Sequence, residues 1–117
     1  MRLSDSEISQ ILAALGPHLQ EVQARLMLFG SRVNDSLRGG DIDLALVVFN
    51  ADDFHRLSRD SYKLLASIKM HLECDERIDL LVTTPERREA DPFQKMALAS
   101  AIELCSWPQD ERLGQSV

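Results

Sequence analysis

The stretch LFGSRVNDSLRGGDIDLALVV, residues 28–48, joins two apolar runs through a polar segment. Its second run is aliphatic and β-branched, and it predicts a strand over Ile42–Phe49. Asp41 and Asp43 stand at the start of that strand. Because side chains alternate between the faces of a strand, both carboxylates lie on one face and the aliphatic residues between them on the other. A half-buried strand does not ordinarily begin in this way, so we expect the two acids to bind something.

The residues on either side of this stretch predict alternating helices and strands. Ser4 and Glu7 have capping-box spacing and begin a helix that ends at Gly16-Pro17. The other predicted elements are a strand over Ala24–Phe29, a short helix over Ser31–Leu37, a helix over Ala51–Glu73, a strand over Arg77–Thr83 and a last helix from Asp91-Pro92 to about Cys105, with Trp107 capping its end. This order predicts an α/β (α+β) fold with a single small mixed sheet covered by helices, its strands in chain order.

Length and charge limit the class of protein. The 117 residues fit one domain, which we expect over residues 1–107, followed by a polar tail over residues 108–117. The net charge of -6 argues against nucleic acid as a partner, because such proteins carry clustered basic residues. Bound metal can reverse the local sign of the charge, so an anionic small molecule stays possible.

Cysteine content and hydropathy predict a cytoplasmic protein. Cys74 and Cys105 form no disulfide framework, which indicates a reducing compartment. Arg2, Asp5 and Glu7 do not fit a signal peptide, and no apolar run approaches the roughly 18 residues of a membrane span.

A third acid has the same surroundings as the first two. Asp79 lies between Ile78 and Leu80 in the third predicted strand, and it joins Asp41 and Asp43 if that strand pairs in register with the second. Two carboxylates at 4 Å repel by ~4 kcal/mol at an effective dielectric constant of 20. A divalent cation would offset this repulsion, and Mg²⁺ prefers oxygen ligands.

Gly30, Ser31 and Arg32 predict a phosphate site next to these acids. Glycine lets the backbone approach a ligand closely, and a helix that starts at Ser31 would turn its free N–H groups toward an anion. The Ser31 hydroxyl and the Arg32 guanidinium add donors. An ordinary surface position for Arg32 is an equal alternative.

Together, GSRVNDSLRGGDIDL and the later RIDLL resemble the nucleotidyltransferase signature of the DNA polymerase β superfamily, in the short form of the minimal nucleotidyltransferases of prokaryotes. The resemblance covers about Ala24 to Thr83. Many relatives have a glycine a few residues after the arginine and a serine before the first acid. Asn34-Asp35 and Gly40 occupy those places here, which leaves the acids intact and affects only the loop.

The resemblance implies a polymerase-β-like palm, with residues 1–107 as the nucleotidyltransferase domain. Gly30 and Ser31 would hold the triphosphate, Asp41 and Asp43 would ligate two Mg²⁺ ions, and Asp79 would ligate one of them and help to deprotonate an acceptor hydroxyl. The reaction would transfer a nucleoside monophosphate, as AMP from ATP, and release pyrophosphate.

The resemblance also implies a partner. Minimal relatives are often antitoxins of a helical HEPN-type toxin, and some transfer AMP to a toxin tyrosine. Others pair with a helical substrate-binding subunit, and a homodimer is a further possibility. The alternatives are a non-catalytic antitoxin or complex subunit that acts by binding, and a solvated strand start for the acids.

Overall fold

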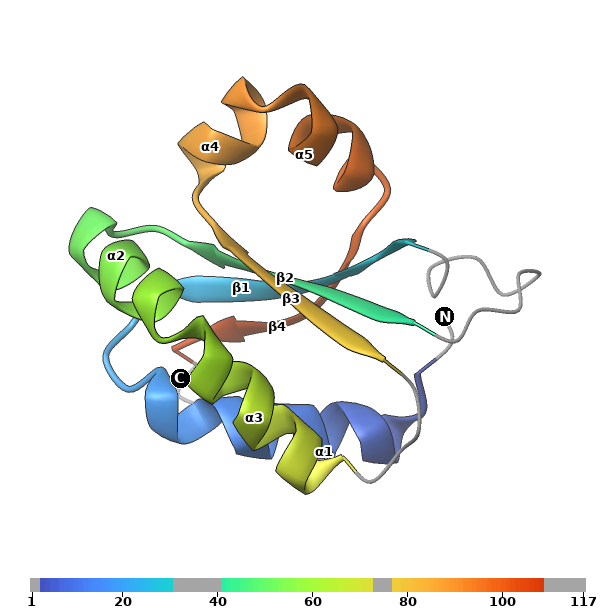
Figure 1. Cartoon of the computed structure of the whole chain (residues 1–117). Helices are drawn as coiled ribbons and strands as arrows, with labels where there is room; N and C mark the ends of the chain where they lie inside the picture. Colours follow the sequence, from blue (N-terminus) through green and yellow to red (C-terminus); the bar gives the residue numbers. More distant parts are fainter. Residues whose placement is uncertain (1–2, 31–40, 73–76, 109–117) are drawn as a thin grey trace, which may run out of the picture.

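A computed structural model describes residues 3–30, 41–72 and 77–108 of the protein. Its centre is a four-stranded mixed sheet in the order β3-β2-β1-β4 (Figure 1). The strands are β1 (Ala24–Phe29), β2 (Ile42–Val48), β3 (Ile78–Thr83) and β4 (Ile102–Trp107). The predicted α/β fold with one small mixed sheet is confirmed. The first three strands lie side by side in chain order, also as predicted.

The pairing of the strands follows from the lengths of their connections. β1 is antiparallel to both β2 and β4, with an irregularity in the β4 register next to Leu26. β2 and β3 are parallel, and the helices α2 (Ala51–Arg59) and α3 (Ser61–His71) make the long crossover that a parallel pair requires. This crossover brings the starts of β2 and β3 to the same end of the sheet.

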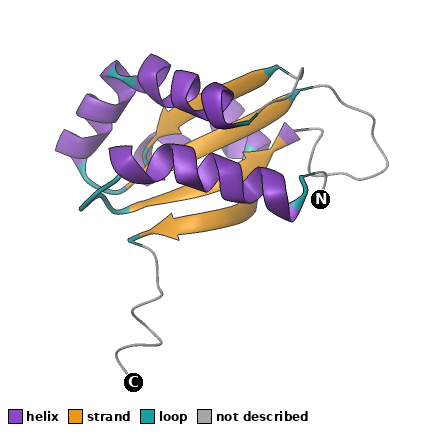
Figure 2. Ribbon diagram, turned by 90° about the horizontal axis from the view of Figure 1, so that it is seen from below, coloured by secondary structure: helices purple, strands orange, loops and turns teal. Residues whose placement is uncertain are grey.

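Three helices cover one face of the sheet. α1 (Asp5–Leu15) begins at the capping box of Ser4 and Glu7, as predicted, and is followed by a 3-10 turn, η1 (Gly16–His18). Figure 2 shows helices lying across the strands on this side. The core here joins aliphatic residues of the sheet to those of α1, α2 and α3; it includes Ile11, Leu15, Leu26, Leu28, Ile42, Leu44, Leu46, Leu57, Leu64 and Ile68.

The opposite face carries two short helices, α4 (Pro85–Ala90) and α5 (Pro92–Ala97), which lie above the sheet in Figure 1. The Thr83 hydroxyl is fully buried and donates a hydrogen bond of 2.6 Å to Oε1 of Gln94, which ties α5 to the far end of β3. Thr83 is four residues beyond Asp79 in β3, about 13 Å along the strand. Asp79 is exposed on this same face, at the start of β3.

The prediction of a last helix from Asp91-Pro92 to about Cys105 is wrong beyond Ala97. Residues 102–107 form β4, and Trp107 is a buried residue at the end of this strand instead of a helix cap. The apolar residues of this segment fit helical spacing and alternation equally well. The free edge of β1 decides between them, because pairing with β4 satisfies its backbone N–H and C=O groups.

The single helix predicted over Ala51–Glu73 is two helices that meet at Asp60, which has non-helical dihedral angles (φ -99°, ψ 18°). The sequence analysis also missed α4. Its signal was present, because Thr84 caps the helix by accepting a hydrogen bond from the Arg87 N–H at 3.1 Å, with Pro85 in the first turn.

The short helix predicted over Ser31–Leu37 and most of the predicted polar tail, residues 109–117, lie outside the described residues. Within the described ranges, no helix has the length and apolar character needed to cross a membrane.

Candidate active site

The starts of the two parallel strands bring two of the predicted acids together. β2 and β3 pair in register, with Asp43 directly beside Asp79. The backbone N–H of Ile42 donates a 2.8 Å hydrogen bond to the carbonyl of Arg77, which extends the pairing to the strand ends. Since Ile42 and Leu44 are fully buried against the helices, Asp43 points to the opposite face. In-register pairing, the condition for Asp79 to meet Asp43, is therefore fulfilled.

Gly30 contacts Asp43 from the side of β1, opposite Asp79. Phe29, the last residue of β1, is the register partner of Asp43, and Gly30 then turns with a positive φ of 78°. A Cβ atom at Gly30 would overlap the Asp43 carboxylate, with Cγ of Asp43 only 3.2 Å away. Glycine is therefore required here both for its conformation and for the close approach of the backbone to the acid.

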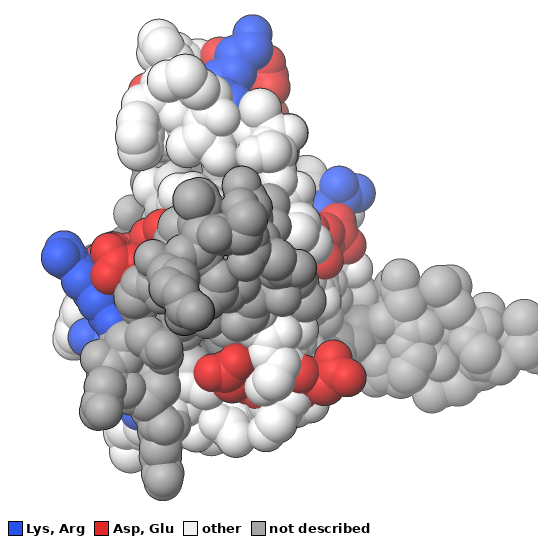
Figure 3. Space-filling view, turned by 90° about the vertical axis from the view of Figure 1, so that its right-hand side faces the viewer, with Lys and Arg blue, Asp and Glu red and all other residues white. Residues whose placement is uncertain are grey.

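The acids interact electrostatically. Burial raises the pKa of the Asp43 carboxyl, the negative charges of Asp79 and Asp41 raise it further, and the positive charge of Arg77 lowers it. Asp41 itself is exposed and immediately precedes β2. All three predicted acids thus lie at one end of the sheet, with Asp43 the most enclosed. Figure 3 looks toward the molecule from this end and shows acidic side chains exposed there.

Arg77 is a member of this cluster that the sequence analysis missed. Its Nε lies 3.5 Å from Oδ1 of Asp79, and the side chains are 73% and 51% exposed. Such an exposed pair contributes little to stability, so Arg77 is free to exchange partners. The signal in the sequence was the spacing of two residues along a strand, which places both side chains on one face.

The three acids are suitable metal ligands by their chemistry, but their carboxylates are not arranged around one point. In ranges 3–30, 41–72 and 77–108, no group of three or more His, Cys, Asp or Glu side chains is arranged to hold one. The donors are nevertheless of the right kind, since Mg²⁺ prefers carboxylate oxygens. Asp79 would have to release Arg77, and the carboxylates of Asp41 and Asp43 would have to turn toward it, before the three acids could share a cation.

Two of the predicted phosphate ligands, Ser31 and Arg32, lie outside the described residues, and only Gly30 of that trio is placed. The chain matches no protein-family model, no curated protein and no solved structure. Chemistry at this end of the sheet is therefore inferred from Gly30, the three acids and Arg77.

Proposed function

We propose that the protein is a Mg²⁺-dependent nucleotidyltransferase that transfers a nucleoside monophosphate, AMP from ATP, to a hydroxyl of a partner protein. One observation carries the proposal. Asp43 lies between Asp79 of the adjacent parallel strand and the backbone of Gly30. This juxtaposition of a backbone turn and two carboxylates is what the resemblance to minimal nucleotidyltransferases requires.

In this proposal each group has a separate task. Gly30 lets the backbone approach the triphosphate closely, and Ser31 and Arg32 donate to its oxygens. Two Mg²⁺ ions held by Asp41, Asp43 and Asp79 would supply the positive charge that neutralises the triphosphate and helps the acceptor hydroxyl to lose its proton. Asp79 would help to take up the proton of the acceptor hydroxyl, the acceptor oxygen would attack the α-phosphorus, and pyrophosphate would leave. The Asp79 side chain is 51% exposed, which would leave it accessible to an acceptor.

We propose that the acceptor surface comes from a second chain, as the resemblance to minimal nucleotidyltransferases implies. The net charge of -6 favours a basic protein over nucleic acid. We propose a helical HEPN-type toxin or substrate-binding subunit in the cytoplasm, with this protein as its antitoxin, and a homodimer as the other way to complete the site.

Calorimetry tests the nucleotide site. A non-hydrolysable ATP analogue should bind in Mg²⁺ and lose its affinity in EDTA, and Asp43→Asn should abolish binding. Asp52→Asn, an exposed acid of α2 remote from the cluster, is the matched control and should leave affinity unchanged. Equal affinity with and without the divalent cation would refute the metal-dependent site.

Intact-mass spectrometry of the co-expressed pair tests the transfer. The partner should gain one or more AMP units with the wild-type chain and none with Asp43→Ala or Asp79→Ala. An unmodified partner, together with adenylylation of tRNA or a small molecule, would refute the protein acceptor but retain the transferase.

A second candidate function is a non-catalytic antitoxin or complex subunit. The ion pair between Arg77 and Asp79 favours it, because Arg77 contacts one of the three acids that would have to bind the metal. Stable association and full neutralisation of the partner by Asp43→Ala, without any nucleotide transfer by the wild-type chain, would support this function. Loss of neutralisation in Asp43→Ala would exclude it.

A further inference from the structure

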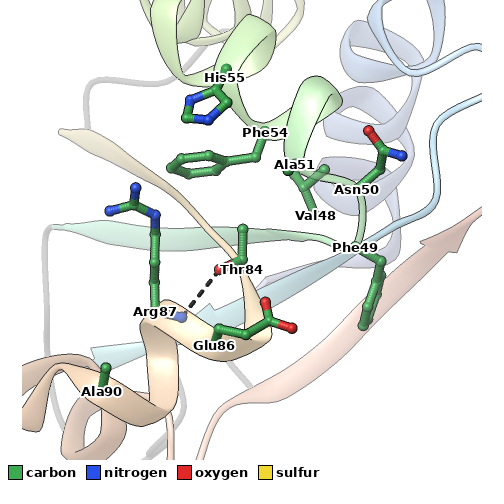
Figure 4. A pocket seen from close by; sticks show the side chains of 10 residues that line it. All are labelled: Val48, Phe49, Asn50, Ala51, Phe54, His55, Thr84, Glu86, Arg87 and Ala90. Carbon is green, nitrogen blue, oxygen red and sulfur yellow. Dashed lines mark hydrogen bonds between the residues drawn. The ribbon is translucent and has the colours of Figure 1, made fainter.

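A cavity lies at the carboxyl ends of β2 and β3, away from the acids. It has a volume of about 520 Å³ and opens between the start of α2 and α4 (Figure 4). Its lining residues are Val48, Phe49, Asn50, Ala51, Phe54, His55, Thr84, Glu86, Arg87 and Ala90. The volume falls in the range of small-molecule sites, and the carboxyl ends of parallel strands are where open α/β sheets bind ligands.

The floor of this cavity is apolar. Val48 is fully buried and Phe54 is 7% exposed, and both belong to the main core. Phe54 presents its ring toward the hollow from α2 (Figure 4). The flat surface that is open to water comes from other lining residues, since Phe49 is 41% exposed and His55 is exposed, and a flat apolar group would cover them favourably.

A positively charged side chain, that of Arg87, covers part of this apolar floor. The Arg87 guanidinium lies 4.5 Å from the centre of the Phe54 ring, and the His55 ring is tilted against the same ring at 5.3 Å between centroids. In the described part of the chain, no carboxylate lies within ion-pair distance of the Arg87 guanidinium. Stacking fixes the plane of the guanidinium and leaves its N–H donors available to a ligand.

The acidic side chain in the lining, that of Glu86, points away from the Arg87 guanidinium. Figure 4 shows the Glu86 carboxylate pointing toward Phe49, while Arg87 extends toward Phe54 and His55. An anionic group is therefore favoured at the Arg87 end and disfavoured at the Glu86 end, which would orient a bound molecule.

We propose that this cavity binds a small aromatic carboxylate, with its ring in the hollow between the start of α2 and α4 and its carboxylate on Arg87. The volume accommodates one or two fused rings with their substituents. A planar, bidentate pairing of guanidinium and carboxylate fixes the orientation, and His55 closes the aromatic side. The site is separate from the proposed nucleotidyltransferase site, because none of its lining residues is Gly30, Asp41, Asp43 or Asp79.

Titration of the full-length ¹⁵N-labelled chain with 2-naphthoate, followed by NMR, tests the proposal. Saturable shifts should appear in the amides of residues 48–55 and 84–90. Arg87→Gln should weaken binding by about tenfold or more, the loss expected for a charge-assisted hydrogen-bonded pair. Arg88→Gln changes the next residue of α4, which does not line the cavity, and should bind like the wild type.

Two further measurements separate the possible outcomes. The neutral analogue 2-naphthalenemethanol should bind at least several-fold more weakly than the carboxylate. Ala90→Phe fills the cavity from an exposed position and should block binding even if Arg87→Gln does not fold. Equal binding of the neutral analogue, shifts elsewhere in the chain, or no saturation at millimolar probe would overturn the proposal. Asp43→Asn should leave naphthoate binding unchanged, so failure of either site is recognised independently.

Discussion

Replacing Gly30 with alanine should destabilise the fold through two separable effects. The first is conformational, because Gly30 has a φ of 78°, a region that costs an L-residue about 1–2 kcal/mol. The second is steric, because the new methyl group would overlap the Asp43 carboxylate. Moving that carboxylate off its preferred rotamer costs roughly 0.5–1.5 kcal/mol.

The two effects sum to a loss of about 1.5–3.5 kcal/mol in the free energy of unfolding for Gly30→Ala. In an Asp43→Ala background only the conformational part should persist, since the atoms that overlap most are absent; the remaining Cβ of residue 43 would lie 3.4 Å from the new methyl group, an ordinary contact. The expected coupling between the two substitutions is therefore about 1 kcal/mol.

Urea denaturation of the wild type, both single variants and the double variant measures this coupling. Trp107, the only tryptophan, is 7% exposed and reports unfolding by its fluorescence. An unchanged slope with denaturant is needed for the comparison to be valid. A loss from Gly30→Ala of less than about 0.5 kcal/mol would refute the positive φ, since that conformation alone costs more. An equal loss in both backgrounds would refute the close approach of Gly30 to Asp43.

Three other changes probe the acids, the α5 anchor and the first helix. Asp43→Asn should raise the free energy of unfolding of the metal-free chain by about 1 kcal/mol at pH 7. Burial and the neighbouring acids raise the folded-state pKa of Asp43, so the cost of its charge appears as the pH rises from the unfolded pKa through the folded one. The gain should therefore shrink toward about pH 4 in urea titrations, and a loss of stability at pH 7 would contradict it. Thr83→Val removes the buried donor to Gln94 and should cost about 1–2 kcal/mol, whereas an unchanged urea midpoint would show that α5 is held by other contacts. Ser4→Ala should cost about 1 kcal/mol in the same assay by removing the 3.1 Å cap to the Glu7 N–H, and Ser9→Ala, at an exposed position of α1, is its control.

Local patterns predicted the part of the fold that holds the acids. The alternation of acidic and aliphatic residues at residues 41–44 and 78–80 was enough to predict which face of the sheet each acid occupies. The in-register pairing of the two strands could not be predicted from the sequence. It depends on the path that the crossover through α2 and α3 takes. In the structure this pairing sets Asp43 beside Asp79.

The last strand shows where local patterns fail. Residues 102–107 contain apolar positions that satisfy either period, and nothing within the segment favours strand over helix. The deciding interaction is with β1, far away in the sequence. The ion pair between Arg77 and Asp79 escaped prediction for a different reason, since the spacing of the two residues allows a pair but their exposed side chains have many other possible partners.

The pairing of β1 with β4 has a consequence for the protein as it is made. β1 ends at Phe29 and β4 begins at Ile102, so one edge of β1 has no partner until nearly all of the described chain has left the ribosome. An unpaired strand edge is a template for pairing with other chains. A nascent chain that stalls before Ile102, or one shortened by proteolysis at that point, should therefore be held by chaperones or aggregate, while in the longer chain β4 pairs with this edge of β1 and becomes the edge strand itself.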